Sequence, residues 1–170
     1  MSIFNYAAFA LFPLAMAYTA ASDLLSMTIP NRVSIILVAG FAALAPFIPG
    51  MDLATFGLHF ATGAAVLAGG FIFYSFGWVG GGDAKIAAAA ALWLGFGHAA
   101  EFLIWTALFG GALTLVLLLA RRRLLPIFAI KHQWIVRLHD PDTGVPYGLA
   151  LGAAALMIYP QTGWSNLVLG

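Results

Sequence analysis

Residues 53–100 read LATFGLHFATGAAVLAGGFIFYSFGWVGGGDAKIAAAAALWLGFGHAA, two apolar runs on either side of a three-glycine turn. Each run, Leu53–Trp78 and Ile86–Ala100, is predicted to form a membrane helix. The turn between them carries a carboxylate, Asp83, and an amine, Lys85. Glycine adopts positive φ angles and lets another backbone approach closely, and aspartate is a common N-cap residue. The stretch alone therefore leaves two interpretations open, a turn in which Asp83 caps the next helix or a functional site.

The whole chain has the composition of a membrane protein. Apolar residues make up 63% of it and charged residues 8%, and its mean hydropathy is +1.00, whereas soluble domains have about 45–50% apolar and about 25% charged residues. Its 170 residues suffice for about six spans of roughly 20 residues. We therefore predict an all-α bundle of about six transmembrane helices, with residues 1–170 as one membrane-embedded domain.

Charge and cysteine content exclude several classes of function. The net charge of +1 provides no field that would attract nucleic acid. The absence of cysteine excludes disulfides, thiolate zinc sites and cysteine nucleophiles. No metal site is predicted among the histidines, which are scattered along the chain: His59, His98, His132 and His139. The first residues lack the pattern of a cleaved signal peptide, so the first apolar run is expected to be retained.

The predicted spans alternate with short polar connections. They are Ile3–Ala21, Val33–Met51, Leu53–Trp78, Ile86–Ala100, Phe102–Ala120 and Val145–Val168. Between the last two, Ile127–Leu138 mixes apolar and basic residues and is predicted to lie on the membrane surface as an amphipathic segment. At the entry of the last span, Pro146-Tyr147-Gly148 favours a plain helix start over a break that faces a substrate.

All seven Lys and Arg residues fall in the first, third and fifth loops between these spans. The second and fourth loops contain only the acids Asp52 and Glu101. Because cationic loops stay in the cytoplasm, the odd loops are predicted to face it. Asp23, just after the first span, then lies on the same side as Asp83. The triplet Arg121–Arg123 is interpreted as a topology anchor rather than as a substrate contact.

Two aspartates at the same membrane depth could supply the acid and the base of a proteolytic site. Two carboxyl groups close together cannot both ionise, so one of them keeps its proton. The ionised group would act as base on a water, while the protonated one polarises a peptide carbonyl and later protonates the amine. This is aspartic peptidase chemistry, which requires no cofactor. The alternatives are a small transporter with Asp23 and Asp83 as a relay, or a secretion-system scaffold subunit in which both cap helices. No inverted repeat, which would favour a transporter, is found.

Two motifs resemble those of a known family. Asp23 is followed six residues later by Ile29-Pro30-Asn31, and Gly80-Gly81-Gly82-Asp83-Ala84-Lys85 comes about 60 residues on. Together they closely resemble the type IV prepilin peptidases, which are GxGD-type intramembrane aspartic peptidases. The resemblance is greatest to the short form associated with Flp/Tad-type pili. Unlike many relatives, the chain is uncharged over Leu24–Thr28.

The resemblance implies a catalytic pair, Asp23 and Asp83. It also implies supporting roles for the rest of the two motifs: Gly80, Gly82, Lys85, Pro30 and Asn31. The implied substrates are prepilin or pseudopilin precursors, cleaved at the cytoplasmic face of the bacterial inner membrane. Components of pilus or secretion assembly are further partners that it implies. Because the cysteine-bearing insertion of the long forms is lacking, methylation of the product is not expected.

The segregation of Lys and Arg predicts where a reporter enzyme will be active in intact cells. A cytoplasm-active reporter fused after Arg123 should be active, and the same reporter fused at Asp52 or Gly170 should be inactive. A periplasmic signal from the loop that contains Lys85 would contradict this topology and would separate Asp83 from Asp23.

Overall fold

The computed structural model describes residues 3–164, which form helices joined by turns, with no strand among them. The longer helices are α1 (Ile3–Ser26), α2 (Asn31–Leu44), α3 (Leu53–Ser75), α4 (Gly81–Leu94), α5 (Phe96–Arg121) and α8 (Tyr147–Ile158). Two short helices lie between α5 and α8, and single 3₁₀ turns follow α2 and α8: α6 (Ile127–Ile130), α7 (Gln133–His139), η1 (Ala45–Phe47) and η2 (Tyr159–Gln161). The prediction of an all-α fold is confirmed.

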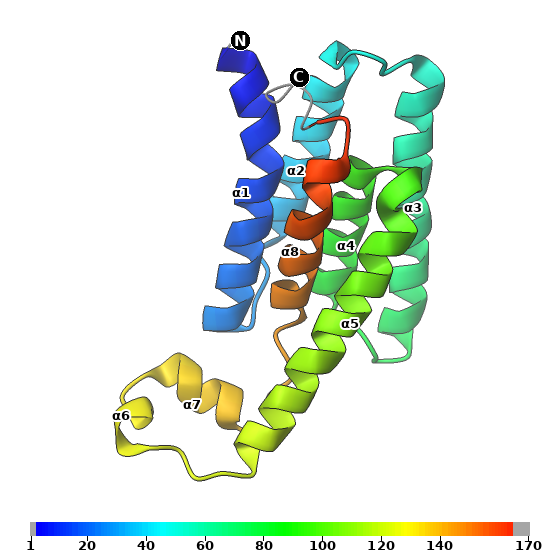
Figure 1. The fold of residues 1–170 in the computed structure, drawn as a ribbon. Helices are drawn as coiled ribbons and strands as arrows, with labels where there is room; N and C mark the ends of the chain where they lie inside the picture. Colours follow the sequence, from blue (N-terminus) through cyan, green and yellow to red (C-terminus); the bar gives the residue numbers. More distant parts are fainter. Residues whose placement is uncertain (1–2, 165–170) are drawn as a thin grey trace.

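Helices α4 and α8 form the centre of the bundle (Figure 1). Helix α4 packs against α2, α3 and α8, while α8 also packs against α1 and α5. Small side chains make up much of the buried surface of both helices, as in Ala88–Ala91 of α4 and Ala154–Ala155 of α8. Small residues allow neighbouring helix backbones to approach closely in membrane proteins. The composition of these two helices thus explains why they occupy the centre.

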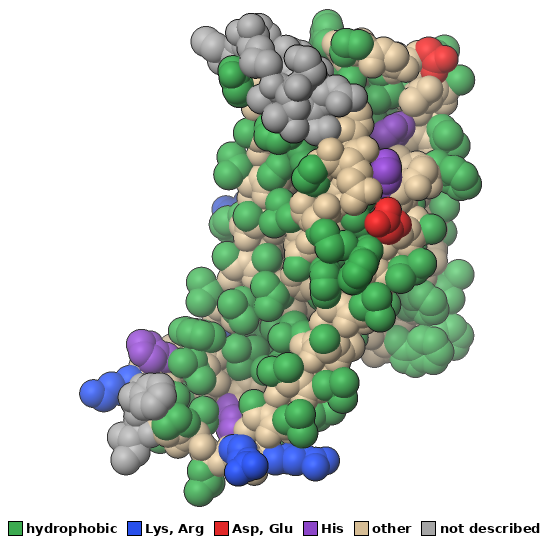
Figure 2. Space-filling view, viewed as in Figure 1, with side chains coloured by type: hydrophobic (Ala, Val, Ile, Leu, Met, Phe, Trp, Pro, Cys, Tyr) green, Lys and Arg blue, Asp and Glu red, His purple; other side chains and the backbone are tan. Residues whose placement is uncertain are grey.

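The two ends of the bundle differ in charge. Helices α6 and α7 lie beyond one end, opposite the start of α1 (Figure 1). On the face shown in Figure 2, most of the visible Lys and Arg side chains gather at the α6–α7 end, and the visible Asp and Glu side chains lie in the other half. On this face the visible Lys and Arg side chains are therefore concentrated toward the α6–α7 end, where Asp140 and Asp142 of the turn after α7 also lie.

Only some of the predicted spans form helices of membrane length. In the described part of the chain, three helices are long and apolar enough to cross a membrane: residues 8–26 of α1, α3 and α5. Helices α2 and α4 have 14 residues each, and α8 has 12. At 1.5 Å per residue these are about 18–21 Å long, shorter than the roughly 30 Å hydrocarbon core of a bilayer. The predicted count of six full spans is not confirmed.

The boundary between α4 and α5 differs from the predicted one. Gly95 has a φ angle of 75°, a left-handed conformation that favours glycine, and it ends α4 at Leu94. Helix α5 therefore begins at Phe96, six residues before the predicted start at Phe102. As a result Glu101 lies inside α5 rather than in a loop.

Other predicted boundaries shift for similar local reasons. Helix α1 continues beyond the predicted end at Ala21 to Ser26, because nothing in that turn breaks a helix. The predicted amphipathic segment is divided into α6 and α7 at Lys131. Helix α8 ends before a 3₁₀ turn that contains Pro160, and residues 165–168 of the predicted last span lie outside the described residues.

Glycines bring α3 against α4. A Cβ atom added to Gly70 would lie 2.9 Å from the Cβ atom of Ala84, and one added to Gly63 would lie 3.1 Å from that of Leu92. At Gly69, the neighbour of Gly70, a Cβ atom would have no other atom within 4 Å. The close approach of the two helices thus depends on particular glycines and not on glycine content in general.

Gly70→Ala should therefore lower the midpoint of thermal unfolding in detergent, because the new methyl group overlaps Ala84. Overpacking of this kind costs about 1–3 kcal/mol. Gly69→Ala is the matched control: it gains up to about 1 kcal/mol of helix propensity without a clash, so its midpoint should be unchanged or higher. Equal midpoints for the two variants would contradict the close packing of α3 on α4.

Candidate active site

Asp23 lies in the last turn of α1 and is nearly buried. Asp23 is 6% exposed, and its Oδ2 atom accepts a hydrogen bond of 2.6 Å from the backbone N–H of Gly148. Gly148 is the second residue of α8, where the N–H groups have no partner within the helix. The positive end of the α8 dipole also favours an anion at this position. Helix α8 therefore begins at the Asp23 carboxylate and holds it.

Gly148 is required at this contact by its lack of a side chain. A Cβ atom there would lie 2.7 Å from the Cβ atom of Asp23 and 2.9 Å from the Cδ1 atom of Ile29. Two residues earlier, Pro146 is the N-cap of α8 and is fully buried. Its ring fixes the φ angle, so the chain enters α8 along a defined path. Helix α8 does begin at the predicted place, and that start meets Asp23.

Asp83 lies in the first turn of α4, after the three-glycine turn. The residue that caps α4 is Gly80, without a side-chain hydrogen bond, so the alternative in which Asp83 is the N-cap of this helix is wrong. The helix begins early enough to place Asp83 at its third position, and the carboxylate folds back toward Gly80. A Cβ atom on Gly80 would lie 2.8 Å from Asp83 Oδ2. The turn therefore leaves room for the carboxylate above the glycine backbone.

The connection between α1 and α2 brings the two motifs together. Ile29 lies against the start of α4, where a Cβ atom on Gly82 would be 3.4 Å from the Ile29 Cβ atom. The tip of the same side chain lies against Gly148, beside Asp23. Asp23 and Asp83 are close enough to interact electrostatically. Within the described residues, neither carboxylate forms an ion pair with a cation.

The predicted residues Lys85, Pro30 and Asn31 link the start of α4 to the start of α2. Lys85 Nζ donates a hydrogen bond of 3.0 Å to Asn31 Oδ1, across 54 residues of sequence. Pro30 is the N-cap of α2 and Asn31 its first residue. Lys85 thus contacts Asn31 and not Asp83, and it joins the starts of α2 and α4. All seven predicted site residues lie at the end of α1, at the start of α2 or at the start of α4 with the turn before it. Their catalytic and supporting roles stay predictions.

An apolar pocket extends from Asp83 along the bundle. This α3–α5 pocket has a volume of about 530 Å³. Its lining comes from α3, α4, α5 and α8 and includes Gly69, Gly70, Phe73, Asp83, Ala87, Leu103, Thr106 and Tyr147. The lining is mainly apolar, and Asp83 contributes a carboxyl group to it.

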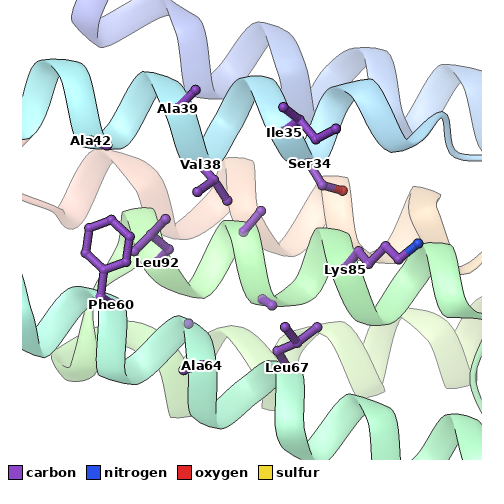
Figure 3. A pocket seen from close by; sticks show the side chains of 13 residues that line it. Ser34, Ile35, Val38, Ala39, Ala42, Phe60, Ala64, Leu67, Lys85 and Leu92 are labelled. Carbon is purple, nitrogen blue, oxygen red and sulfur yellow. The ribbon is translucent and has the colours of Figure 1, made fainter.

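A second apolar pocket lies on the other side of α4. This α2–α3 pocket, also of about 530 Å³, is lined by residues that include Ser34, Val38, Phe60, Gly63, Leu67, Lys85, Ala88 and Leu92. Figure 3 shows Lys85 toward one end of it and Phe60 toward the other. It contains no carboxylate, so of these two pockets the α3–α5 pocket is the one equipped for acid–base chemistry.

The acids of the two even-numbered predicted loops have other surroundings. Asp52 caps α3 by accepting a hydrogen bond of 2.7 Å from the N–H of Thr55, which holds the pKa of Asp52 below its usual value. On α5, the Oε2 atom of Glu101 lies 4.0 Å from the Nδ1 atom of His98. No group of three His, Asp or Glu side chains that could hold a metal ion occurs among the described residues.

Sequence reasoning missed the role of Gly148. The motif Pro146-Tyr147-Gly148 was the available signal: it permits a break that faces a substrate near the active site, but it favours a plain helix start. Its contact with Asp23 spans 125 residues and arises from the packing of α8 against α1. Tyr147, which lines the α3–α5 pocket, was likewise not predicted to lie beside Asp83.

Comparison with known proteins identifies a matching family. The sequence model of the type IV leader peptidase family matches residues 10–115, more than half of the chain, and the matched range includes both aspartates and both motifs. No match was found among curated proteins or among solved structures. The match stops before Gly148, so the contact between α8 and Asp23 is a finding of the structure alone. By this match, the chain belongs to the type IV leader peptidase family.

Proposed function

We propose that this protein is an intramembrane aspartic endopeptidase that removes the leader peptide from type IV prepilin-like precursors. The observation that carries the proposal is the meeting of Asp23 and Asp83, from helices far apart in sequence, around Ile29. Membership of the leader peptidase family supports the reaction class. The two carboxyl groups supply an acid and a base without a metal ion.

We infer the roles of the two carboxyl groups from their different surroundings. The N–H of Gly148 donates to Asp23, and N–H donors stabilise an ionised carboxylate. Asp83 lines an apolar pocket, where the neutral form is favoured. In the free enzyme Asp23 therefore carries the charge and Asp83 the proton. Asp23 accepts a proton from the attacking water while Asp83 donates a hydrogen bond to the scissile carbonyl. As the intermediate collapses, Asp23 passes that proton to the leaving amine, which restores both carboxyl groups to their starting states.

The unequal lengths of the helices favour a site below the membrane surface. Helices α3 and α5 have 23 and 26 residues, whereas α4 and α8, which begin at the site, have 14 and 12. If all six longer helices enter a bilayer side by side, the starts of α4 and α8 are recessed between longer neighbours. Irregular backbone at that depth is tolerated where it lines a cavity, as the glycine turn would.

The α3–α5 pocket suits the apolar part of a precursor. Its lining is almost entirely apolar apart from Asp83, so a transmembrane helix entering from the lipid would bury its side chains there. The end of that helix must unwind beside Asp83 to open its peptide bond to water. The basic residues near α6 and α7 favour a cytoplasmic location for this end of the bundle, in the bacterial inner membrane. The products would pass to a pilus or secretion assembly.

Asp23→Asn and Asp83→Asn should each abolish detectable cleavage of a prepilin by the purified enzyme. Each change keeps the size of the side chain but removes its acid–base function, which contributes about 10²–10⁴-fold. Because the two groups act as a unit, the double variant should be no slower than either single one. The products are measured by mass spectrometry after incubation with candidate precursors.

Asp52→Asn and Glu101→Gln are the matched controls and should cleave at the wild-type rate, since both acids lie away from the site. Near wild-type cleavage by either Asn variant at position 23 or 83 would rule out the pair as catalytic. Loss of both Asn variants from the membrane would instead favour a structural role, as in a transporter or scaffold subunit.

Cleavage should also continue in the presence of EDTA. The proposed reaction uses only water and two carboxyl groups, so removing divalent cations removes nothing that it needs. The rate of product formation by the dialysed protein, with and without chelator, gives the comparison. A chelator-sensitive rate that zinc or another divalent ion restores would show that the two-carboxylate mechanism is incomplete.

A further inference from the structure

The basic segment after α5 contains an arginine with an unusual set of partners. Arg121, the last residue of α5, donates from Nε to the carbonyl oxygen of Leu138 at 2.9 Å. Its Nη2 atom donates to the carbonyl oxygens of Thr143 at 2.8 Å and Gly144 at 3.0 Å. Hydrogen bonds from a charged donor are stronger than those between neutral groups. One side chain thus fixes both sides of the turn between α7 and α8.

The turn that Arg121 holds leads directly to the Asp23 site. Only three residues separate Gly144 from Gly148, whose N–H binds Asp23. One of them, Pro146, is fully buried and has a φ angle fixed by its ring. The N–H of Tyr147 donates to the carbonyl oxygen of Val145 at 2.8 Å. The path from the Arg121 hydrogen bonds to the Gly148 N–H is therefore short and stiff.

A second arginine holds the other partner of the same hydrogen bond. Arg137 of α7 donates from Nη1 to the carbonyl oxygen of Leu25 at 2.9 Å. Leu25 lies in the last turn of α1, two residues after Asp23. Arg121 thus acts on the backbone that supplies the Gly148 donor, and Arg137 on the backbone that supplies the Asp23 acceptor.

The neighbours of Arg121 differ from it although they share its charge. Arg122 and Arg123 are exposed, and within the described residues no hydrogen bond or ion pair of their side chains is found. A topology anchor requires only positive charge on one side of the membrane, which all three residues supply. It does not require three directed hydrogen bonds from one guanidinium group, whose planar fork a lysine cannot reproduce.

We propose that Arg121 and Arg137 are positioning residues that fix the Asp23 carboxylate in its reactive place by holding the two backbone segments joined by the Asp23–Gly148 hydrogen bond. The proposal rests on the proposed function, in which Asp23 activates water. It gives the basic segment after α5 a part in catalysis. This part is separate from any effect of its positive charges on the orientation of the protein in the membrane.

The test compares Arg121→Gln with Arg122→Gln in a cleavage assay of purified enzyme on a model prepilin. A displacement of about 1 Å at a reacting group can cost about 10²-fold in rate, so kcat of Arg121→Gln should fall about 10–100-fold, with KM within about twofold. Arg122→Gln should match the wild type in both constants. Arg121→Lys keeps the charge but replaces the planar guanidinium group by a single donor nitrogen, and it should have an intermediate kcat.

Arg137→Gln provides a second, independent variant, with an expected loss of kcat in the same direction. The midpoint of thermal unfolding in detergent is recorded for every variant, so that loss of fold is distinguished from loss of positioning. Equal effects of Arg121→Gln and Arg122→Gln would overturn the proposal in favour of a charge or topology role. A rise in KM with kcat unchanged would overturn it in favour of substrate binding, and failure of both Arg121→Gln and Arg137→Gln to accumulate would overturn it in favour of folding.

The same assay separates this proposal from the proposed function. If the wild type cleaves, the Asp23→Asn variant does not, and Arg121→Gln has normal kcat, then only the positioning role fails. If the wild type cleaves no prepilin, or Asp23→Asn cleaves normally, then the proposed function fails first.

Discussion

The site depends on one hydrogen bond, from the N–H of Gly148 to the carboxylate of Asp23. It joins the end of α1 to the start of α8 and thereby closes the bundle around the central helices. A buried carboxylate without such a donor would be costly, so the bond makes the burial of Asp23 tolerable. It also brings the tip of Ile29 into the same contact, and through Ile29 the start of α4 with Asp83. This hydrogen bond and the Ile29 contacts therefore bring three helix ends together at the site.

Much of the fold was predictable because it follows from composition and from the residues that interrupt the apolar runs. Apolar runs separated by glycine, proline and a few charges predict helices, and α3, whose predicted run was Leu53–Trp78, ends within three residues of the predicted boundary. The segregation of Lys and Arg placed Asp23 and Asp83 on the same side, and the structure brings their segments together. The topology of the chain predicted only that the two aspartates share one side of the membrane, and the resemblance to a known family was needed to pair them.

The features that were missed depend on contacts between distant residues or on single dihedral angles. Gly95 ends α4 through a positive φ angle, and nothing distinguishes it in sequence from Gly97, which lies within α5. Asp83 could have been an N-cap by its residue type, but Gly80 begins the helix earlier. The separate behaviour of Arg121 within an arginine triplet is also invisible in sequence, because it depends on where the carbonyl groups of residues 138–144 lie.

Helix α4 acts as a thin partition between two apolar compartments. Ala84 and Ala87 border the α3–α5 pocket, whereas Ala88 and Ala89 border the α2–α3 pocket. Each of these side chains is a single methyl group. A larger residue at one of these positions would reduce the volume of the pocket that it borders. Ala90 and Ala91 are fully enclosed and leave no such latitude. A larger side chain in place of Ala87 would therefore narrow the α3–α5 pocket alone, and one in place of Ala88 would narrow the α2–α3 pocket alone.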